Sequence, residues 1–180
     1  MTGESVDSSA AKAPVVLTAA MLLEHWQGHR RLSRRVIEAF PEQELFGFSA
    51  GGMRTFAELA TEMLQMIAPT LRGVLEHDWE PGGYGKPGPS TKAGLLEAWD
   101  VADRALADAW PRIPAERFLQ VDNAFGLWTA PIVTTLLYLI DNEVHHRGQG
   151  YVYLRMLGIE PPLFYQRGPQ VPEPGEDGAA

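Results

Sequence analysis

Two polar side chains lie on a face of a predicted helix that should point into the protein core. Asn142 and His146 are four residues apart, so a helix places one above the other on the same face. Gln149 and Tyr153 extend this face by two further turns. A buried polar row needs partners, which are other side chains, water or a metal ion.

A second predicted helix carries a carboxylate in a similar position. Glu62 shares its face with Leu59 and Met66. Carboxylates are rarely buried unless they are paired or bind a metal. If the two helices face each other, Glu62, Asn142 and His146 form a candidate three-donor metal site with open positions.

Other interpretations of the same residues stay open. A histidine on a helix face is more often hydrogen-bonded than metal-bound, and Glu62 could instead pair with Arg147 or Arg155. His25 and His29 also have the spacing of a ligand pair. Basic residues gather in one stretch, which we interpret as a solvated face: His29, Arg30, Arg31, Arg34 and Arg35.

Composition excludes several classes of function. There are 15 basic and 23 acidic residues, a net charge of −8, which disfavours nucleic acid as a partner. The absence of cysteine excludes disulfides, cysteine nucleophiles and thiolate metal sites. Neither a Gly-x-Ser-x-Gly elbow nor a His-Glu-x-x-His motif occurs. No leader and no apolar run of about 18 residues is present, so we expect a soluble, cytoplasmic protein with no membrane contact.

The apolar pattern predicts an all-α fold. A period of about 3.6 residues indicates helices over residues 18–40, 55–70, 91–110 and 129–157. Glycine and proline make 80–90 a loop. We therefore predict one four-helix bundle with long connections over residues 14–167, between disordered tails at 1–13 and 168–180.

Local signals refine these boundaries. Thr55-x-x-Glu58 predicts a capping box at the start of the second helix, and Pro69 predicts a kink within it. Thr129 is the expected N-cap of the last helix. Arg117–Val121 could be a short extended piece. Gly148 and Gly150 inside a helix favour close approach of another helix or subunit.

The stretch DNEVHHRGQGYVYLRMLGIEPPLFY at residues 141–165 resembles the DinB (YfiT/DinB-like) family. Its most specific parts are HHRGQ, YLRMLG and the GIEPP exit, and MRTFAEL extends the resemblance towards residue 18. The resemblance implies an up-down-down-up four-helix bundle, often a homodimer. It also implies a divalent metal, such as nickel or zinc, held by three histidines, and for some members thiol-dependent transferase or isomerase chemistry with mycothiol or bacillithiol.

The resemblance carries the metal site onto three positions of this chain, of which one keeps its histidine. His146 matches the second histidine of the last helix, whereas Asn142 and Glu62 stand where the other two would be. Carboxylate, amide oxygen and imidazole can all bind a metal, and Mn²⁺ becomes as reasonable as Zn²⁺ or Ni²⁺. Alternatively, metal binding is lost and the three side chains hydrogen-bond to one another.

Two classes of function follow. In the first, the protein is a metal-dependent enzyme, a thiol-dependent S-transferase or related hydrolase that acts on a small molecule with a thiol cosubstrate. His25, His29 and Tyr153 are then the candidates for proton transfer or substrate positioning. In the second, it is a non-catalytic stress-response or small-molecule-binding protein of the same family.

Overall fold

The computed structural model describes residues 16–169. Its elements in chain order are α1 (Ala19–Ala39), α2 (Glu42–Gly47), α3 (Phe56–Gln65), α4 (Ile67–Glu76), α5 (Lys92–Ala109), the 3-10 helices η1 (Trp110–Arg112) and η2 (Ala115–Leu119), β1 (Val121–Ala124), β2 (Trp128–Pro131) and α6 (Ile132–Met156). The predicted tails fall outside these residues, apart from residues 168 and 169.

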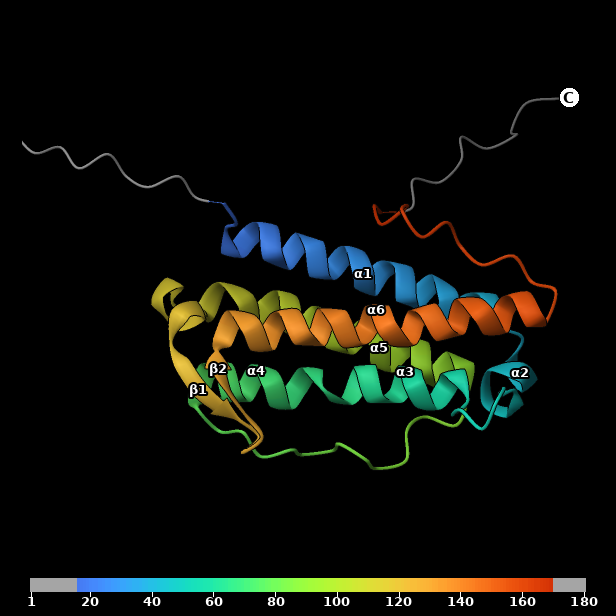
Figure 1. Cartoon of the computed structure of the whole chain (residues 1–180), viewed down its shortest axis with the longest axis horizontal. Coiled ribbons are helices and arrows are strands. Elements are labelled where there is room, and N and C mark those ends of the chain that lie inside the picture. The colour runs from blue at the N-terminus through green and yellow to red at the C-terminus, as the bar shows by residue number, and fades with distance from the viewer. Residues whose placement is uncertain (1–15, 170–180) are drawn as a thin grey trace, which may run out of the picture.

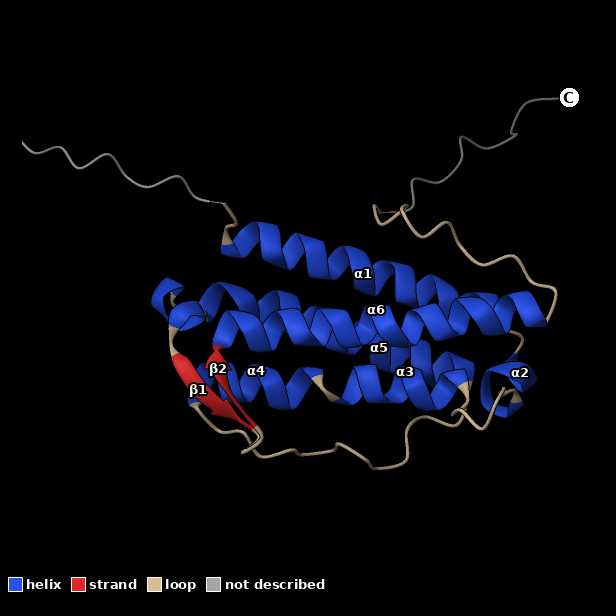
Figure 2. Cartoon of the chain, in the orientation of Figure 1, coloured by secondary structure: helices blue, strands red, loops and turns tan. Residues whose placement is uncertain are grey.

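The chain is mostly helical, as predicted, with a small two-stranded sheet at one end (Figure 2). Figure 1 shows α1, α3–α4, α5 and α6 lying side by side, with α1 and α6 running one way and α3–α4 and α5 the other. Within residues 16–169, no helix is both long enough and apolar enough to span a membrane.

The second predicted helix is broken into α3 and α4. Its capping box is confirmed, because the backbone N–H of Glu58 donates to Thr55 Oγ1 and that of Thr55 donates to Glu58. The break falls at Met66, three residues before Pro69. Proline lacks the N–H that would bond to the carbonyl of Gln65, and its ring crowds that carbonyl. The kink is therefore displaced by one helical turn from the proline that causes it.

The connection before α6 differs from the prediction. Residues 115–119 form the 3-10 helix η2 rather than an extended piece, and a β-hairpin follows it. Thr129 is not a cap: it pairs with Asn123 across the hairpin, and α6 begins after Pro131. Pro131 occupies the N-cap position with φ −55°, a backbone angle that suits entry into a helix, and no side chain caps the first turn of α6.

Arg117 fastens this hairpin to the bundle. The guanidinium donates to the backbone oxygens of Val74 (2.8 Å) and Gly73 (3.0 Å) near the end of α4, and to Asp122 (2.6 Å) in β1. A helix leaves its last four carbonyls without a partner inside the helix. Arg117 bonds to two of them, and the Gly73 carbonyl also accepts the N–H of His77 at 3.0 Å. The buried Arg117 thus bonds to the last turn of α4 and holds β1 beside it.

The basic stretch of α1 is not a solvated face, which corrects the prediction. Arg30 is fully buried over the ring of Trp99, 4.2 Å from its centroid, and pairs with Asp103. Its neighbour Arg34 is bound by Asp100. The arginines instead neutralise carboxylates that α5 brings against α1.

Candidate functional site

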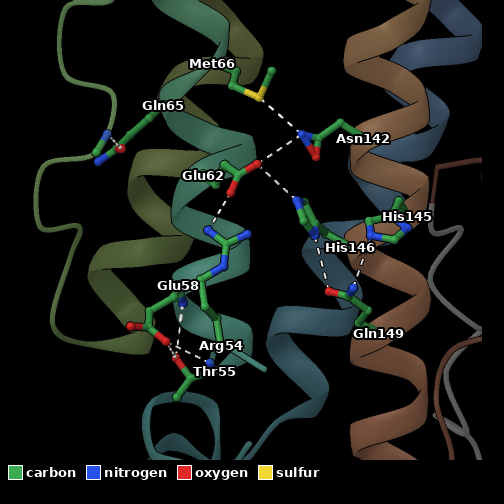
Figure 3. A network of polar contacts seen from close by, with 11 residues as sticks. Arg54, Thr55, Glu58, Glu62, Gln65, Met66, Asn142, His145, His146 and Gln149 are labelled. Carbon is green, nitrogen blue, oxygen red and sulfur yellow. Dashed lines mark hydrogen bonds and ion pairs between the residues drawn. The ribbon is translucent and has the colours of Figure 1, made fainter. Parts of the chain in front are cut away.

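Helices α3 and α6 face each other and bring together the three residues singled out from the sequence (Figure 3). Glu62 Oε1 accepts a hydrogen bond from Asn142 Nδ2 at 3.2 Å and lies 3.1 Å from His146 Nε2. One carboxylate oxygen is therefore the meeting point of both α6 side chains. Their role in holding a metal stays a prediction.

The charge on Glu62 is balanced by an arginine that the sequence analysis did not single out. Arg54 Nη1 lies 2.5 Å from Glu62 Oε2, so the pairing residue is neither Arg147 nor Arg155. Burial raises the pKa of Glu62, but the hydrogen bonds from Arg54 and His146 outweigh it and hold the pKa below its usual range. The carboxylate is thus ionised at neutral pH.

The His146 ring is held at both nitrogens. While Nε2 faces Glu62, Nδ1 lies 3.3 Å from the side-chain amide of Gln149, which also reaches the exposed His145. A ring that donates from both nitrogens is the imidazolium. A neutral ring donates from Nε2 alone, and Gln149 then turns its NH2 group towards Nδ1. In either form Gln149 fixes the orientation of the ring.

Asn142 is only half satisfied. Its Nδ2 group donates to Glu62 and contacts the sulfur of Met66 at 3.3 Å, while its Oδ1 atom is buried with no hydrogen-bond partner. Leaving such an oxygen unpaired costs about 1–3 kcal/mol. An unpaired acceptor beside an ionised carboxylate marks a place where a further donor or a cation fits.

The candidate proton-transfer residues lie elsewhere. Tyr153 is buried, and its hydroxyl donates to the backbone oxygen of Arg54 at 3.0 Å. His29 is held between two guanidinium groups, with Arg147 2.8 Å from Nδ1 and Arg167 2.8 Å from Nε2, and His25 packs edge-on against it. The structure does not place any of the three candidates in hydrogen-bond contact with Glu62.

Glu62 lies where three hollows meet. The largest, about 720 Å³, separates α3 from the loop at residues 84–89. A second, about 270 Å³, is lined by aromatic side chains of the loop, the hairpin and α6. The third, about 400 Å³, opens over Asn142, His145 and His146. A molecule in any of the three would reach the carboxylate.

The loop wall is fastened to α3 by Gln65, whose amide donates to the Lys86 carbonyl (2.8 Å) and accepts from the Gly85 N–H (3.0 Å). The clamp lies next to Tyr84, which lines the same hollow as Glu62. Sequence reasoning missed Arg54, Gln65 and Tyr84. The position of Arg54 next to the capping box was the one available signal.

The sequence profile of the DinB family matches residues 15–176. The chain belongs to the DinB family. The match covers the whole bundle, so α3 and α6 with the residues around Glu62 lie inside the region that defines this membership.

Two solved DinB-like structures resemble the chain. One, from Bacillus cereus ATCC 10987, is 23% identical, with a TM-score of 0.67, over 81% of this chain and 97% of its own. The other, from Bacillus subtilis, is 18% identical, with a TM-score of 0.66, over 81% of this chain and 98% of its own. At these identities the likeness shows the DinB-like fold. No curated protein matches the chain significantly.

Proposed function

We propose that this DinB-family protein binds a small organic molecule in the cleft around Glu62. The observation that carries the proposal is the fixed, ionised carboxylate at the junction of three hollows. Binding sites typically combine apolar walls with a few convergent polar groups, and Glu62, Asn142 and His146 supply the polar part. We take the helical segments around them, α1, α3–α4, α5 and α6, to form the up-down-down-up bundle.

A fragment screen by amide NMR tests this proposal. We expect bound fragments to shift the amides of α3 and α6 around Glu62 and Asn142, and Glu62→Gln to weaken the polar fragments about tenfold or more. Glu97→Gln, on the exposed side of α5, is the matched control and should change nothing. Fragments that map elsewhere, or that ignore the Glu62 substitution, would overturn the proposal.

A second candidate is a metal-dependent enzyme that uses the same three residues. The unpaired Asn142 Oδ1 favours it, since that oxygen could join Glu62 and His146 as a ligand. No three His, Cys, Asp or Glu side chains cluster as a metal site within residues 16–169, so the set depends on the amide. Arg54 must first leave Glu62, at a small cost because its side chain is 48% exposed.

The donor set therefore fits a divalent ion such as Zn²⁺, Ni²⁺ or Mn²⁺, with Glu62, Asn142 and His146 as the ligands. A bound ion would supply a Lewis acid that polarises a thiol or water, as a thiol-dependent S-transferase or hydrolase requires. Around it, Gln149 would orient the imidazole, and Arg54, once released, would be free to bind an anionic group of the substrate.

Elemental analysis of untagged protein purified without chelator separates the two candidates. About one equivalent of metal, lost in His146→Ala, would support the enzyme. Less than about a tenth of an equivalent of metal after soaking in Zn²⁺, Ni²⁺ and Mn²⁺ would contradict the enzyme and favour a binding site without metal. Glu62→His with Asn142→His should then create tight Zn²⁺ or Ni²⁺ binding if these positions face one another as described.

The remaining expectations are proposals of the same kind. They are a homodimer, a thiol cosubstrate, a role in stress response and a cytoplasmic location. Gly148 bears on the homodimer, because a Cβ added there would meet no atom within 4 Å. The outer face of α6 at this glycine is therefore open to a second copy.

A further inference from the structure

The second hollow beside Glu62 has a distinct chemistry. Four aromatic side chains line it, from the loop, the hairpin and α6: Tyr84, Phe125, Trp128 and Tyr138. Glu62 is the one charged side chain in its lining, and Arg54 belongs to the neighbouring hollow instead. The cavity of about 270 Å³ thus has aromatic walls and a carboxylate at one end.

The rings are mutually oriented. Trp128 and Tyr138 lie with centroids 5.4 Å apart and planes tilted by 37°, and Phe125 stands edge-on to Trp128 at 6.5 Å. Trp128 and Tyr138 are each 45% exposed and adjacent, so their rings form part of one apolar surface rather than scattered exposed residues. Both side chains line the hollow and keep part of their surface uncovered, so a ligand in the hollow would contact them.

The backbone is strained at Phe125, one of the aromatic residues that line this hollow. Phe125, at the hairpin tip, has φ +56°, in the left-handed region that bulky residues avoid. Its ring packs edge-on against Trp79 at 5.2 Å, and Trp79 in turn lies directly on Gly73 of α4. Strain of about 1–3 kcal/mol persists only where the surrounding structure imposes it, and such residues cluster at ligand sites.

The electrostatic balance favours positive charge. Arg54 pairs with Glu62 from the largest hollow, and Asp141 lines the third hollow together with two histidines. In the aromatic hollow itself the Glu62 carboxylate is the one charged group, and the lining contains no Lys, Arg or His. Burial and the Glu62 carboxylate raise the pKa of Tyr84, which keeps its phenol neutral. The whole chain carries a net charge of −8. An anionic ligand would meet repulsion here, whereas a cation over aromatic faces is attracted.

We propose that the aromatic hollow binds an organic cation, an alkylated or quaternary ammonium group whose charge lies over the rings and near Glu62. This inference rests on the proposed small-molecule cleft and specifies the class of its ligand. The unpaired Oδ1 of Asn142, which also lines the hollow, would accept from an N–H or O–H of the same molecule.

Three molecules of nearly the same shape test the charge preference. They are choline, the neutral 3,3-dimethylbutan-1-ol and the anion 3,3-dimethylbutanoate. Each is titrated at constant ionic strength into full-length protein labelled with 5-fluorotryptophan, and the Trp128 signal is followed by fluorine NMR. We expect choline to bind about tenfold or more tightly than the alcohol, and the carboxylate to bind weakest.

Substitutions in and outside the hollow test which residues cause the preference for choline. Trp128→Leu keeps an apolar side chain but removes a ring, so choline binding followed by calorimetry should fall at least about fivefold. Phe164→Leu removes a ring that is 71% exposed and does not line the hollow, and it should have no effect. Glu62→Gln should abolish the preference for choline over the alcohol while leaving the alcohol bound.

The outcomes separate this inference from the proposal beneath it. If the alcohol or the carboxylate binds as tightly as choline, the inference of an organic cation is wrong, while the proposed small-molecule cleft is unaffected. If none of the three moves the Trp128 signal while fragments still shift the amides around Glu62, the inference again fails alone. If fragments also avoid Glu62, both proposals are overturned.

Discussion

Phe56 of α3 packs directly onto Gly150 of α6. A Cβ added at Gly150 would stand 2.4 Å from Cε2 of Phe56, closer than any real contact. This confirms the expectation that a glycine inside the last helix permits close approach of another helix. The two helices that meet here carry Glu62 and His146, so the contact also sets the spacing of the candidate site.

Substitution of Gly150 should therefore be costly. We expect Gly150→Ala to lower the free energy of unfolding by about 1–3 kcal/mol, because Phe56 must move to admit the methyl group. Urea unfolding measures this. Gly148→Ala on the open face of the same helix is the control, and it should leave stability unchanged or raise it by up to about 1 kcal/mol. Equal effects of the two variants would contradict the packing described.

His29 should make the fold sensitive to mild acid. Burial, with the charges of Arg147 and Arg167, lowers its pKa to about 3 from a reference value of 6.5. Below pH 6.5 the His29 imidazole is protonated in the unfolded chain but stays neutral in the folded chain. The free energy of unfolding therefore decreases as the pH falls, down to about pH 3. From pH 7.5 to 5.5 this one group removes about 1.4 kcal/mol.

Urea unfolding at the two pH values checks this expectation. His29→Gln should lose about 1.4 kcal/mol less than the wild type between pH 7.5 and 5.5. Ser33→Ala disturbs the same cluster, since Ser33 accepts from Arg147, but it keeps the histidine and should retain the full pH dependence. An unchanged pH dependence in His29→Gln would show that His29 accepts its proton in the folded state.

Arg117 should stabilise both α4 and the hairpin. Replacement by methionine keeps apolar bulk but removes the guanidinium bonds to two backbone carbonyls and to Asp122. The Gly73 carbonyl and the Asp122 carboxylate each keep a backbone N–H donor, so the Val74 carbonyl alone is left unpaired. We expect Arg117→Met to destabilise by about 1–3 kcal/mol and to reduce hydrogen-exchange protection in the hairpin. Arg112→Met, on an exposed position of η1, should stay within about 0.5 kcal/mol of the wild type.

Tyr153 should behave as a structural residue. Its hydroxyl is committed to the Arg54 carbonyl, so Tyr153→Phe should cost about 1 kcal/mol of stability and leave choline and fragment affinities unchanged. Unfolding and titration on the same samples separate the two effects. A tenfold loss of affinity with no loss of stability would return Tyr153 to the list of residues that contact the ligand.

The sequence predicted which site residues share a helix face because helical spacing is a local property. Any helix places Asn142 and His146 on one face, and α3 places Glu62 on the face of Leu59, whatever the rest of the chain does. The capping box at Thr55 is equally local, since both of its hydrogen bonds close within three residues. Sequence alone therefore indicated the long helical segments and the faces on which these side chains lie, but not α2, the position of the break between α3 and α4 or the start of α6.

The missed features depend on partners far apart in the chain. Arg117 terminates a helix more than 40 residues earlier, and nothing in its own neighbourhood indicates this. The hairpin was missed because its two strands are four residues each, too short to establish an alternating pattern. The left-handed Phe125 gives no signal in the sequence, because turn positions of this kind favour Gly or Asn.

The sequence by itself determined a mostly helical DinB-family chain with a carboxylate on one helix and an amide and an imidazole on another. Only the tertiary structure decided what surrounds them. Arg54 neutralises Glu62, His29 is held between two arginines away from the site, and loop and hairpin aromatic rings enclose a hollow. Helical periodicity is encoded in neighbouring residues, whereas these contacts exist only when distant segments pack.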